Sequence, residues 1–307
     1  FLSRRLIQRL VTANPSPGYV YRVSQTFRTT NADFPAVLKA ILLDPEARAP
    51  QTAETPAGSG KVREPILRAT AFMRAFGASS SMALSDLTAW GYPSAELAKF
   101  PAGTTRYRLN RTPALDQSPL SAPSVFNWFL PDYAPSGLIA ANGIVSPEPQ
   151  IATETTAGSA ANFSYKGTYT AAGFTPNTGL PNLTGNPQRI NIDITPLESL
   201  YLSKLDTNGD GLFSPADTST FNNPVAIAAA GEAVVDRIDL LLTGGELKAR
   251  FGNTTGTPRR IILDAVAATN SGTNSNADPA VQASTAVSRI RTPLWLVMVS
   301  PQGVTQK

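Results

Sequence analysis

The stretch PVAIAAAGEAVVDRIDLLLTGG, residues 224–245, decides the fold class of this 307-residue chain. Its larger apolar side chains recur three or four residues apart, the spacing that gathers side chains on one face of an α-helix: Val235, Ile238, Leu241 and Leu242. A proline opens the stretch and two glycines close it, as is typical of helix ends. The stretch therefore predicts a long helix with one buried face.

Three further helices are predicted around it. TPLESLYLSKL, residues 195–205, begins with Thr195 as N-cap, Pro196 at the first helical position and Glu198 completing a capping box. TPRRIILDAVAAT, residues 257–269, reads as another helix. The last begins at Asp278 and Pro279, and we expect Pro293 to kink it or to end it.

The first 77 residues also predict helices. FLSRRLIQRLVTA, at the start of the chain, places leucines and isoleucine on one face and Arg4, Arg5 and Arg9 on the other. We interpret these arginines as a solvated helix face. A later helix is predicted to begin at Asp33 as its cap, and another to end at Gly77 in the left-handed conformation.

Helical periodicity fades between these two regions. Residues 152–188 are rich in Thr, Gly, Asn and Ala, a composition that fits an ordered long loop, a small hairpin or a flexible insertion. An aromatic cluster precedes them, which we expect to pack in the core, although it could stack on sugars or dock a partner. Its members are Phe126, Trp128, Phe129 and Tyr133.

These patterns together predict a mainly α fold with a long irregular Thr/Gly/Asn/Pro-rich insertion. We divide the chain into an N-terminal helical segment at 1–77, a loop-rich segment at 78–194 and a C-terminal helical segment at 195–307. We expect the three segments to form one compact unit.

The composition excludes several kinds of chemistry. The chain has no cysteine and no histidine, so it can form no disulfide, no thiolate nucleophile and no Ser-His-Asp triad. Its net charge of +4 is scattered, which does not favour nucleic acid as a partner. No apolar run reaches the roughly 18 residues that a membrane-spanning helix needs. We therefore expect neither a nucleic-acid partner nor a membrane span.

The stretch DTNGDGLFSPAD, residues 206–217, matches a calcium-binding loop of the EF-hand type. Such a loop needs oxygen ligands at positions 1, 3, 5, 7, 9 and 12 and a glycine at position 6, where Gly211 stands. The predicted Ca²⁺ ligands are Asp206, Asn208, Asp210, Leu212, Ser214 and Asp217. Leu212, at position 7, would bind through its backbone carbonyl.

The alternative for this loop is a polar turn without metal, since Asp, Asn and Gly favour turns on their own. Asp217 at position 12 is shorter than the usual glutamate, so its coordination is expected to be weaker. The segment after the loop is also short for a second helix. We therefore predict a structural clip rather than a sensor that opens.

Two other patterns are weaker. GSGK, residues 58–61, lacks the first glycine of a phosphate-binding loop and has Val62 in place of the Ser or Thr that binds magnesium. Four carboxylates could act as acid or base, although nothing in their spacing pairs them. They are Glu64, Asp116, Glu148 and Glu198.

Several long phrases resemble the bacterial "domain of unknown function 1800" family. They cover residues 1–27, 34–48, 61–78 and 118–151, together with the tail SRIRTPLWLVMVSPQGVTQK at 288–307. The resemblance implies a large, mostly helical and usually exported bacterial protein, of which this chain would be the C-terminal half. It implies as partners the N-terminal half of the same protein and a sulfatase-like protein. The resemblance assigns no catalytic residues to this chain, because the family has no settled activity.

Two functions are expected from these observations. The first is an exported, periplasmic, cell-surface or extracellular helical protein, stabilised by calcium, with a structural or assembly role and with other copies of itself as possible partners. The second is a hydrolase-like enzyme that acts on a polymer and whose active site a preceding half of the protein completes. A cleft lined by paired carboxylates would favour the enzyme, and a broad self-contacting interface would favour the structural role.

Overall fold

A computed structural model describes residues 1–49, 59–80, 88, 93, 95, 98, 115–117, 122–125, 127–169, 190–206, 209–210, 223–269 and 279–306. The described residues are mainly helical, with four strands of two residues each, which confirms the mainly α fold class. None of their helices is both long enough and apolar enough to cross a membrane.

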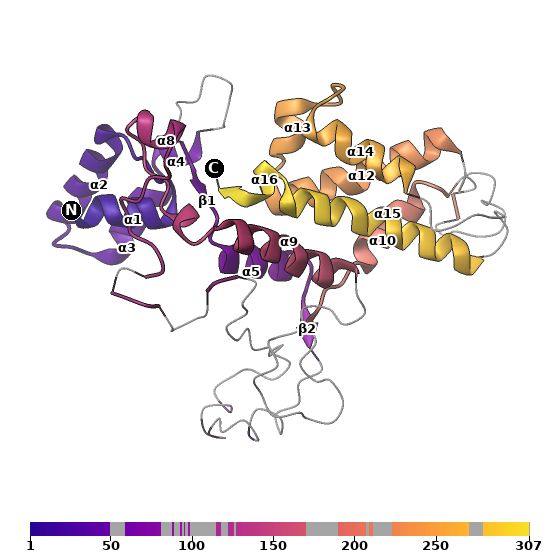
Figure 1. Ribbon diagram of the computed structural model, residues 1–307, viewed down its shortest axis with the longest axis horizontal. Coiled ribbons are helices and arrows are strands. Elements are labelled where there is room, and N and C mark those ends of the chain that lie inside the picture. Colours follow the sequence, from indigo (N-terminus) through magenta and orange to yellow (C-terminus); the bar gives the residue numbers. More distant parts are fainter. Residues whose placement is uncertain are drawn as a thin grey trace. The chain divides into compact units, whose positions relative to one another are not determined.

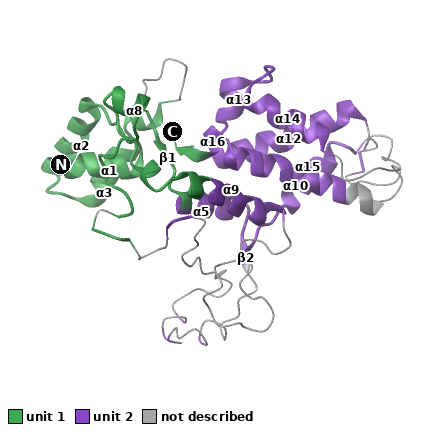
Figure 2. Cartoon of the chain, viewed as in Figure 1, with its two compact units in different colours: residues 1–65, 120–157, 304–307 green, residues 66–119, 158–303 purple. Residues whose placement is uncertain are grey.

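The chain divides into two compact units that alternate along the sequence (Figure 2). Unit 1 comprises Phe1–Pro65, Leu120–Ala157 and Val304–Lys307. Unit 2 comprises Ile66–Pro119 and Gly158–Gly303. The sequence alone suggests three consecutive segments, because local periodicity cannot show which distant stretches contact each other.

Unit 1 is built around three helices: α1 (Leu2–Leu10), α2 (Pro17–Thr29) and α3 (Phe34–Leu42). Figure 1 shows them in indigo, together with α4 (Pro45–Arg48), which contacts α3. The short helix α8 (Leu138–Ala141) also belongs to unit 1. Their apolar faces meet in a small core of fully buried side chains: Ile7, Tyr19, Val23, Val37 and Ile41. The apolar spacing thus predicts the burial of Ile7, whereas Leu2, on the same predicted face of α1, is 41% exposed.

Helices α2, α3 and α4 of unit 1 each begin with a side-chain cap. The Ser16 hydroxyl accepts from the Tyr19 N–H, and the Asp33 carboxylate accepts from the Ala36 N–H, which confirms Asp33 as a cap. Asp44 caps α4, and Arg22 donates to both of its carboxylate oxygens at 2.7 Å. This hydrogen bonding by Arg22 holds the pKa of the Asp44 carboxyl below its ordinary value.

A two-stranded antiparallel sheet joins distant parts of the sequence within unit 1. Strand β1 (Lys61–Val62) pairs with β4 (Thr305–Gln306), with Lys61 opposite Gln306. The Gln306 side chain also donates to the Leu10 carbonyl at 2.7 Å. The short helix η1 (Glu148–Gln150) contacts β1.

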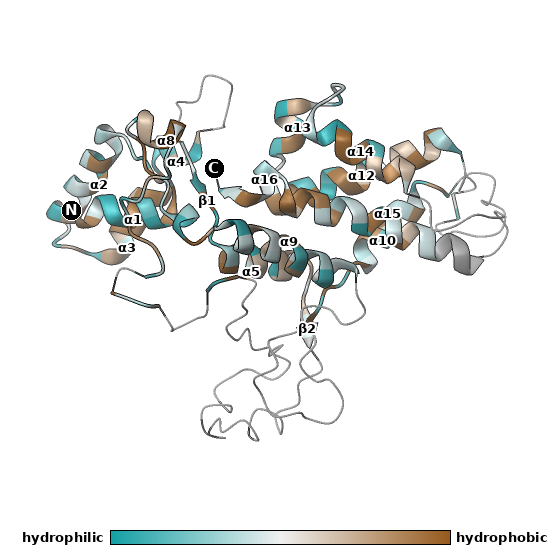
Figure 3. Cartoon of the chain, in the orientation of Figure 1, coloured by the Kyte–Doolittle hydropathy of each residue, from teal (hydrophilic) through white to brown (hydrophobic). Residues whose placement is uncertain are grey.

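Unit 2 is a bundle in which α12 (Pro224–Thr243) contacts four other helices. These are α10 (Thr195–Ser203), α13 (Glu246–Phe251), α14 (Pro258–Ala268) and α15 (Pro279–Val299). Figure 3 shows brown, apolar segments on α12, α14 and α15. The α12 residues Val235 and Ile238 are fully buried and α12 ends at Gly244 in the left-handed conformation, which confirms a long helix with a buried face. Leu241, which the sequence places on the same face, is 36% exposed.

Unit 2 also contains the strand pair β2 (Ser79–Ser80) and β3 (Ile190–Asn191). Helix α5 (Pro65–Ala75) belongs to unit 2 except for its first residue, and α16 (Pro301–Val304) belongs to it except for its last. Gly77 follows α5 with a φ of 52°, as the sequence predicts for a residue that stops a helix.

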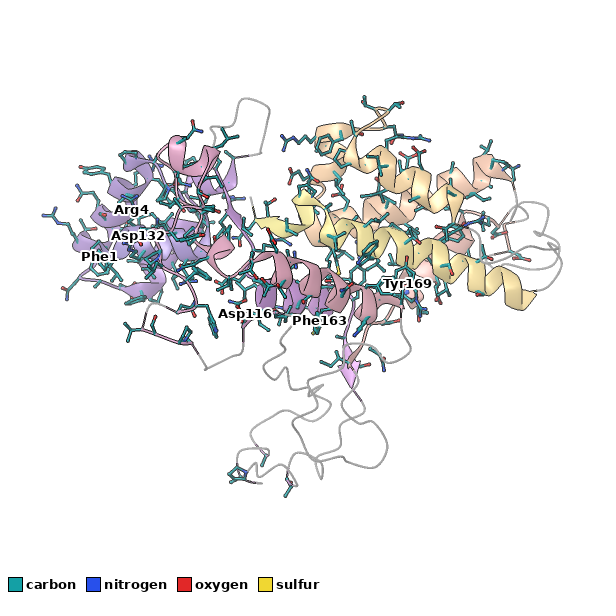
Figure 4. All side chains as sticks on the ribbon, viewed as in Figure 1. Phe1, Arg4, Asp116, Asp132, Phe163 and Tyr169 are labelled. Carbon is teal, nitrogen blue, oxygen red and sulfur yellow. The ribbon has the colours of Figure 1, made fainter. Side chains whose placement is uncertain are left out.

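Helix α9 (Glu154–Tyr169), most of which belongs to unit 2, lies within the Thr/Gly/Asn-rich stretch and is not predicted by the sequence analysis. Its buried residues recur at helical spacing, but most of them are small: Ala160, Phe163, Ser164, Gly167 and Thr168. The Ser164 and Thr168 hydroxyls donate to carbonyls four residues earlier, which satisfies them inside the helix. Figure 4 labels Phe163 and Tyr169 on this helix, and Tyr169 bonds to Thr292 of α15 at 2.9 Å.

One helix start differs from expectation, and a second helix excludes one of the two outcomes expected at Pro293, a kink or an end. Helix α10 has Ile194 as its N-cap residue without a side-chain cap, and Thr195 donates its N–H to Asp193, so the capping box at Thr195 is wrong. Helix α15 continues past Pro293 to Val299 and does not end there. The loss of one backbone hydrogen bond at a proline is offset in α15 by burial of Ile290, Leu294 and Val297.

Candidate functional site

The predicted calcium loop begins directly after α10. Leu205 is fully buried in the unit 2 core and anchors this point of the chain. Asp206 donates its N–H to the Leu202 carbonyl, and its own Oδ1 accepts from the Gly209 N–H at 2.8 Å. Gly209 has a φ of 75°, a left-handed conformation that glycine adopts readily. These hydrogen bonds fix the position of the first predicted ligand.

Only part of the predicted ligand set lies within the described residues. Asp206 is half-buried and Asp210 is exposed. The remaining four ligands, Asn208, Leu212, Ser214 and Asp217, lie outside the described residues. Among the described residues, no three acidic side chains gather into a metal site. The calcium site therefore stays a prediction that rests on the sequence register and on the turn at Asp206.

A pocket of about 550 Å³ lies within unit 1. One wall is a face of α1, where Arg5, Gln8 and Arg9 stand three and four residues apart. The pocket falls within the range of roughly 300–1,000 Å³ that is usual for sites of small ligands. Figure 4 labels two of its lining residues, Phe1 and Asp132.

The opposite wall comes from the aromatic cluster of the sequence. A tight turn closes where the Asn127 N–H donates to the Ser124 carbonyl, and Asn127 has a φ of 75°, which asparagine tolerates better than most residues. Phe129 follows, is only 4% exposed and lines the pocket. The Gln150 side chain accepts from the Leu130 N–H at 2.7 Å, which ties this wall to η1.

Arg9 connects the two walls. Its guanidinium forms an ion pair with Glu64 at 2.8 Å and lies over the Phe129 ring, 4.8 Å from the ring centre. When the Asn127 amide is oriented with its oxygen toward Arg9, that oxygen accepts from both terminal nitrogens, at 3.0 and 3.2 Å. These contacts hold Arg9 in one position and offset its charge.

A buried ion pair lies beneath the pocket. Lys61 Nζ is 2.9 Å from Glu148 Oε1, and their side chains are 1% and 2% exposed. The same ammonium donates to the Arg9 carbonyl at 2.9 Å, near the C-terminal end of α1, where a positive charge is favourable. Glu148 lines the pocket, and its Oε2 is buried without a hydrogen-bond partner in the described structure.

Two charges of the pocket remain without an opposite charge. Arg5 donates to Gln8 Oε1 at 2.8 Å and lies over the Phe1 ring at 5.3 Å. Asp132 is exposed at the pocket. Within the part of the chain that the structure describes, neither forms an ion pair. An exposed carboxylate of this kind is well screened by water, whereas a guanidinium that packs on a ring is more weakly hydrated.

The structure shows which partners and which exposure several of the candidate residues from the sequence have. Lys61 of the GSGK stretch is committed to Glu148, which leaves no ammonium there for a phosphate. Glu64 pairs with Arg9, whereas Asp116 is exposed and Glu198 is half-buried on α10. Of the aromatic cluster, Phe129 is buried as predicted, Trp128 and Tyr133 are half-buried, and Phe126 lies outside the described residues.

The sequence does not predict the pocket itself. We predict a solvated face from Arg4, Arg5 and Arg9, yet only Arg4 of the three is exposed. The available signal was the spacing of Arg5 and Arg9, one helical turn apart on a helix whose other face is apolar. What the spacing cannot show is that residues more than a hundred positions later cover that face.

Comparison with known proteins gives one match. The family model described as "Protein of unknown function (DUF1800)" matches residues 1–299. The match extends through the Thr/Gly/Asn-rich stretch, so it covers most of the chain and not only the phrases that carry the resemblance. No curated protein and no solved structure matches the chain.

Proposed function

Because this chain belongs to the DUF1800 family, whose description assigns no activity, we propose its function from its own residues. We propose an exported helical protein that Ca²⁺ stabilises and that has a structural role in an assembly at the cell surface or outside the cell. The observation that carries the proposal is the acidic loop that begins at Asp206, where α10 has just ended.

The local geometry at Asp206 supports a metal-binding loop. The Asp206 carboxylate accepts the Gly209 N–H, three residues later, so it is held at the start of the loop. Asp206 and Asp210 stand at positions 1 and 5 of the loop, with a glycine at position 6 in the sequence. Calcium needs this combination of hard oxygen ligands and a sharp bend.

The use of charged residues in unit 2 supports a structural role. The Arg259 guanidinium is buried and pairs with Glu232 at 3.1 Å and with Asp236 at 2.6 Å. Hydrogen bonds from Asn253 and Arg259 hold the pKa of the Glu232 carboxyl below its ordinary value. A carboxyl with a lowered pKa stays ionised at neutral pH and is a poor general acid. Asp239 accepts from the N–H groups of Leu247 and Lys248 and so caps α13.

The calcium proposal predicts a stability shift. With a dissociation constant on the order of 10⁻⁴ M and Ca²⁺ at about a hundred times that value, binding stabilises the native state by about 2.7 kcal/mol. We expect the midpoint of thermal unfolding to rise by roughly 5 °C in calcium and to fall back in chelator. Circular dichroism at 222 nm, where the amide signal depends on helix content, follows both transitions.

The Asp206→Asn variant separates the ion from the turn. Asparagine keeps an oxygen that can accept from the Gly209 N–H, so the variant should melt near the wild-type temperature in chelator and show a much smaller rise in calcium. Asp264→Asn is the control, because Asp264 is an exposed partner of Arg260 on α14. It should keep the full calcium shift. Equal melting of the wild type with and without calcium contradicts the proposal.

A hydrolase-like enzyme acting on a polymer is the alternative, and one observation favours it. Asp132 and Glu148 line the same pocket, as a pair of catalytic carboxylates would. An enzyme of this kind should release reducing ends from a polysaccharide, and Asp132→Asn should abolish that release while the fold stays intact. Activity that survives in Asp132→Asn contradicts this assignment.

A further inference from the structure

We propose that the unit 1 pocket binds a small organic carboxylate with an apolar body, its carboxylate on Arg5 and its body against the wall around Phe129. The proposal goes beyond the structural function and does not depend on calcium, because all of its residues belong to unit 1. Nor does it depend on catalysis.

The apolar character of the pocket comes from the wall after Asn127. Phe129, Leu130 and Pro131 follow one another there, and Val125 and Pro147 add further apolar surface. Val125 is 95% exposed and Leu130 is 45% exposed, so apolar surface remains in contact with water. Covering such surface with an apolar group is favourable by about 25 cal/mol per Å².

The charge of the ligand follows from the ion pairs around the pocket. Glu148 is offset by Lys61, and Arg9 is offset by Glu64. Arg5 keeps an uncompensated guanidinium in the part of the structure that is described. A guanidinium presents two parallel N–H groups that match the two oxygens of a carboxylate. Asp132 is exposed and opposes an anion only weakly, since water and salt screen it.

The pocket is held in shape before any ligand arrives. The Gln8 side chain donates to the Ala13 carbonyl at 2.9 Å and accepts from Arg5 at 2.8 Å, so it restrains Arg5 from the side. The segment before Pro147 is fixed by Asn14, which exchanges two hydrogen bonds with the Val145 backbone at 2.8 and 2.9 Å. A preformed site loses little entropy on binding.

Four probes of related shape test the ligand class: phenylacetate, phenylacetamide, acetate and phenethylammonium. Each is titrated into the full chain and followed by isothermal titration calorimetry and ligand-observed NMR. We expect phenylacetate to bind about tenfold more tightly than phenylacetamide, which lacks the charge, and than acetate, which lacks the apolar body. Phenethylammonium carries the opposite charge and should bind most weakly.

Three variants locate the site. Arg5→Gln should weaken phenylacetate binding about tenfold and leave phenylacetamide binding unchanged. Arg4→Gln removes the same charge one residue away on α1, from an exposed side chain that does not line the pocket, and should leave both affinities unchanged. Asp132→Asn should tighten phenylacetate binding slightly, because it removes a negative charge that lines the pocket. The melting temperature of each variant checks that its fold is intact.

Other outcomes overturn the proposal. Equal losses in Arg5→Gln and Arg4→Gln would mean that the anion only senses the net charge of α1. Tighter binding of phenethylammonium than of phenylacetate would mean that Asp132 selects a cation. Absence of binding by phenylacetate in the wild type would remove the proposal entirely, while the calcium-dependent melting shift would still decide the proposed function separately.

Discussion

Replacing Glu148 with leucine should lower the free energy of unfolding by about 3–5 kcal/mol, a large part of the 5–15 kcal/mol that is usual for a domain. The reason is the Lys61 ammonium, whose side chain is 1% exposed and 2.9 Å from Glu148. Without that carboxylate the charge stays buried with only backbone carbonyls as partners. Urea unfolding followed by circular dichroism measures the loss.

The double variant Lys61→Met with Glu148→Leu tests whether charge causes this loss. It removes both charges and fills the space with apolar groups of similar size, so it should recover most of the lost stability. A double variant as unstable as Glu148→Leu alone would show that shape and not charge determines the effect. Lys61→Met alone should be destabilised as well, because it leaves the Glu148 carboxylate buried without its counter-ion.

An exposed ion pair provides the matched comparison. Arg260 and Asp264 are 2.5 Å apart on α14, but their side chains are 41% and 56% exposed. Water stabilises each charge separately there, so Asp264→Leu should cost less than about 1 kcal/mol. The contrast between the two pairs isolates burial as the cause.

The sequence predicts the helices of this protein better than it predicts its pocket. A helix with large apolar residues on one face, such as α12, is recognisable because its spacing and its caps agree. Helix α9 escapes recognition since three of its five buried residues are Ser, Gly and Thr, which have lower helix propensity than Ala or Leu. Its place as a helix comes from packing, with Trp295 donating to the Ala161 carbonyl and Tyr165 meeting the Trp295 ring edge on.

The pocket depends on contacts between distant parts of the sequence. Glu148 and Lys61 are ordinary charged residues in the sequence, 87 positions apart, and only the meeting of η1 with β1 makes them a buried pair. Arg9 similarly gains its role from Glu64 and Phe129. The calcium loop is the opposite case, because all its predicted ligands come from twelve consecutive residues and can be aligned without a fold.

Gly303→Ala should destabilise the protein by about 3 kcal/mol, at the upper end of what overpacking costs. A Cβ on Gly303 would overlap the Val297 carbonyl oxygen and would lie 3.0 Å from the Met298 carbonyl oxygen. Both oxygens belong to the backbone of the last turn of α15, so the clash can be relieved only if the backbone moves. Gly303 has no left-handed φ in the structure, so the requirement for glycine is purely steric.

Two other helical glycines make the prediction an ordered series, measured by urea unfolding under one set of conditions. A Cβ on Gly231 of α12 would lie 2.9 Å from Val266 Cγ1, a side-chain atom that can shift, so Gly231→Ala should cost less than Gly303→Ala. Gly158 of α9 has nothing within 4 Å, and alanine there should stabilise the helix by about 0.5–1 kcal/mol. Equal effects at Gly303 and Gly158 would contradict the steric argument, since helix propensity alone would then explain both.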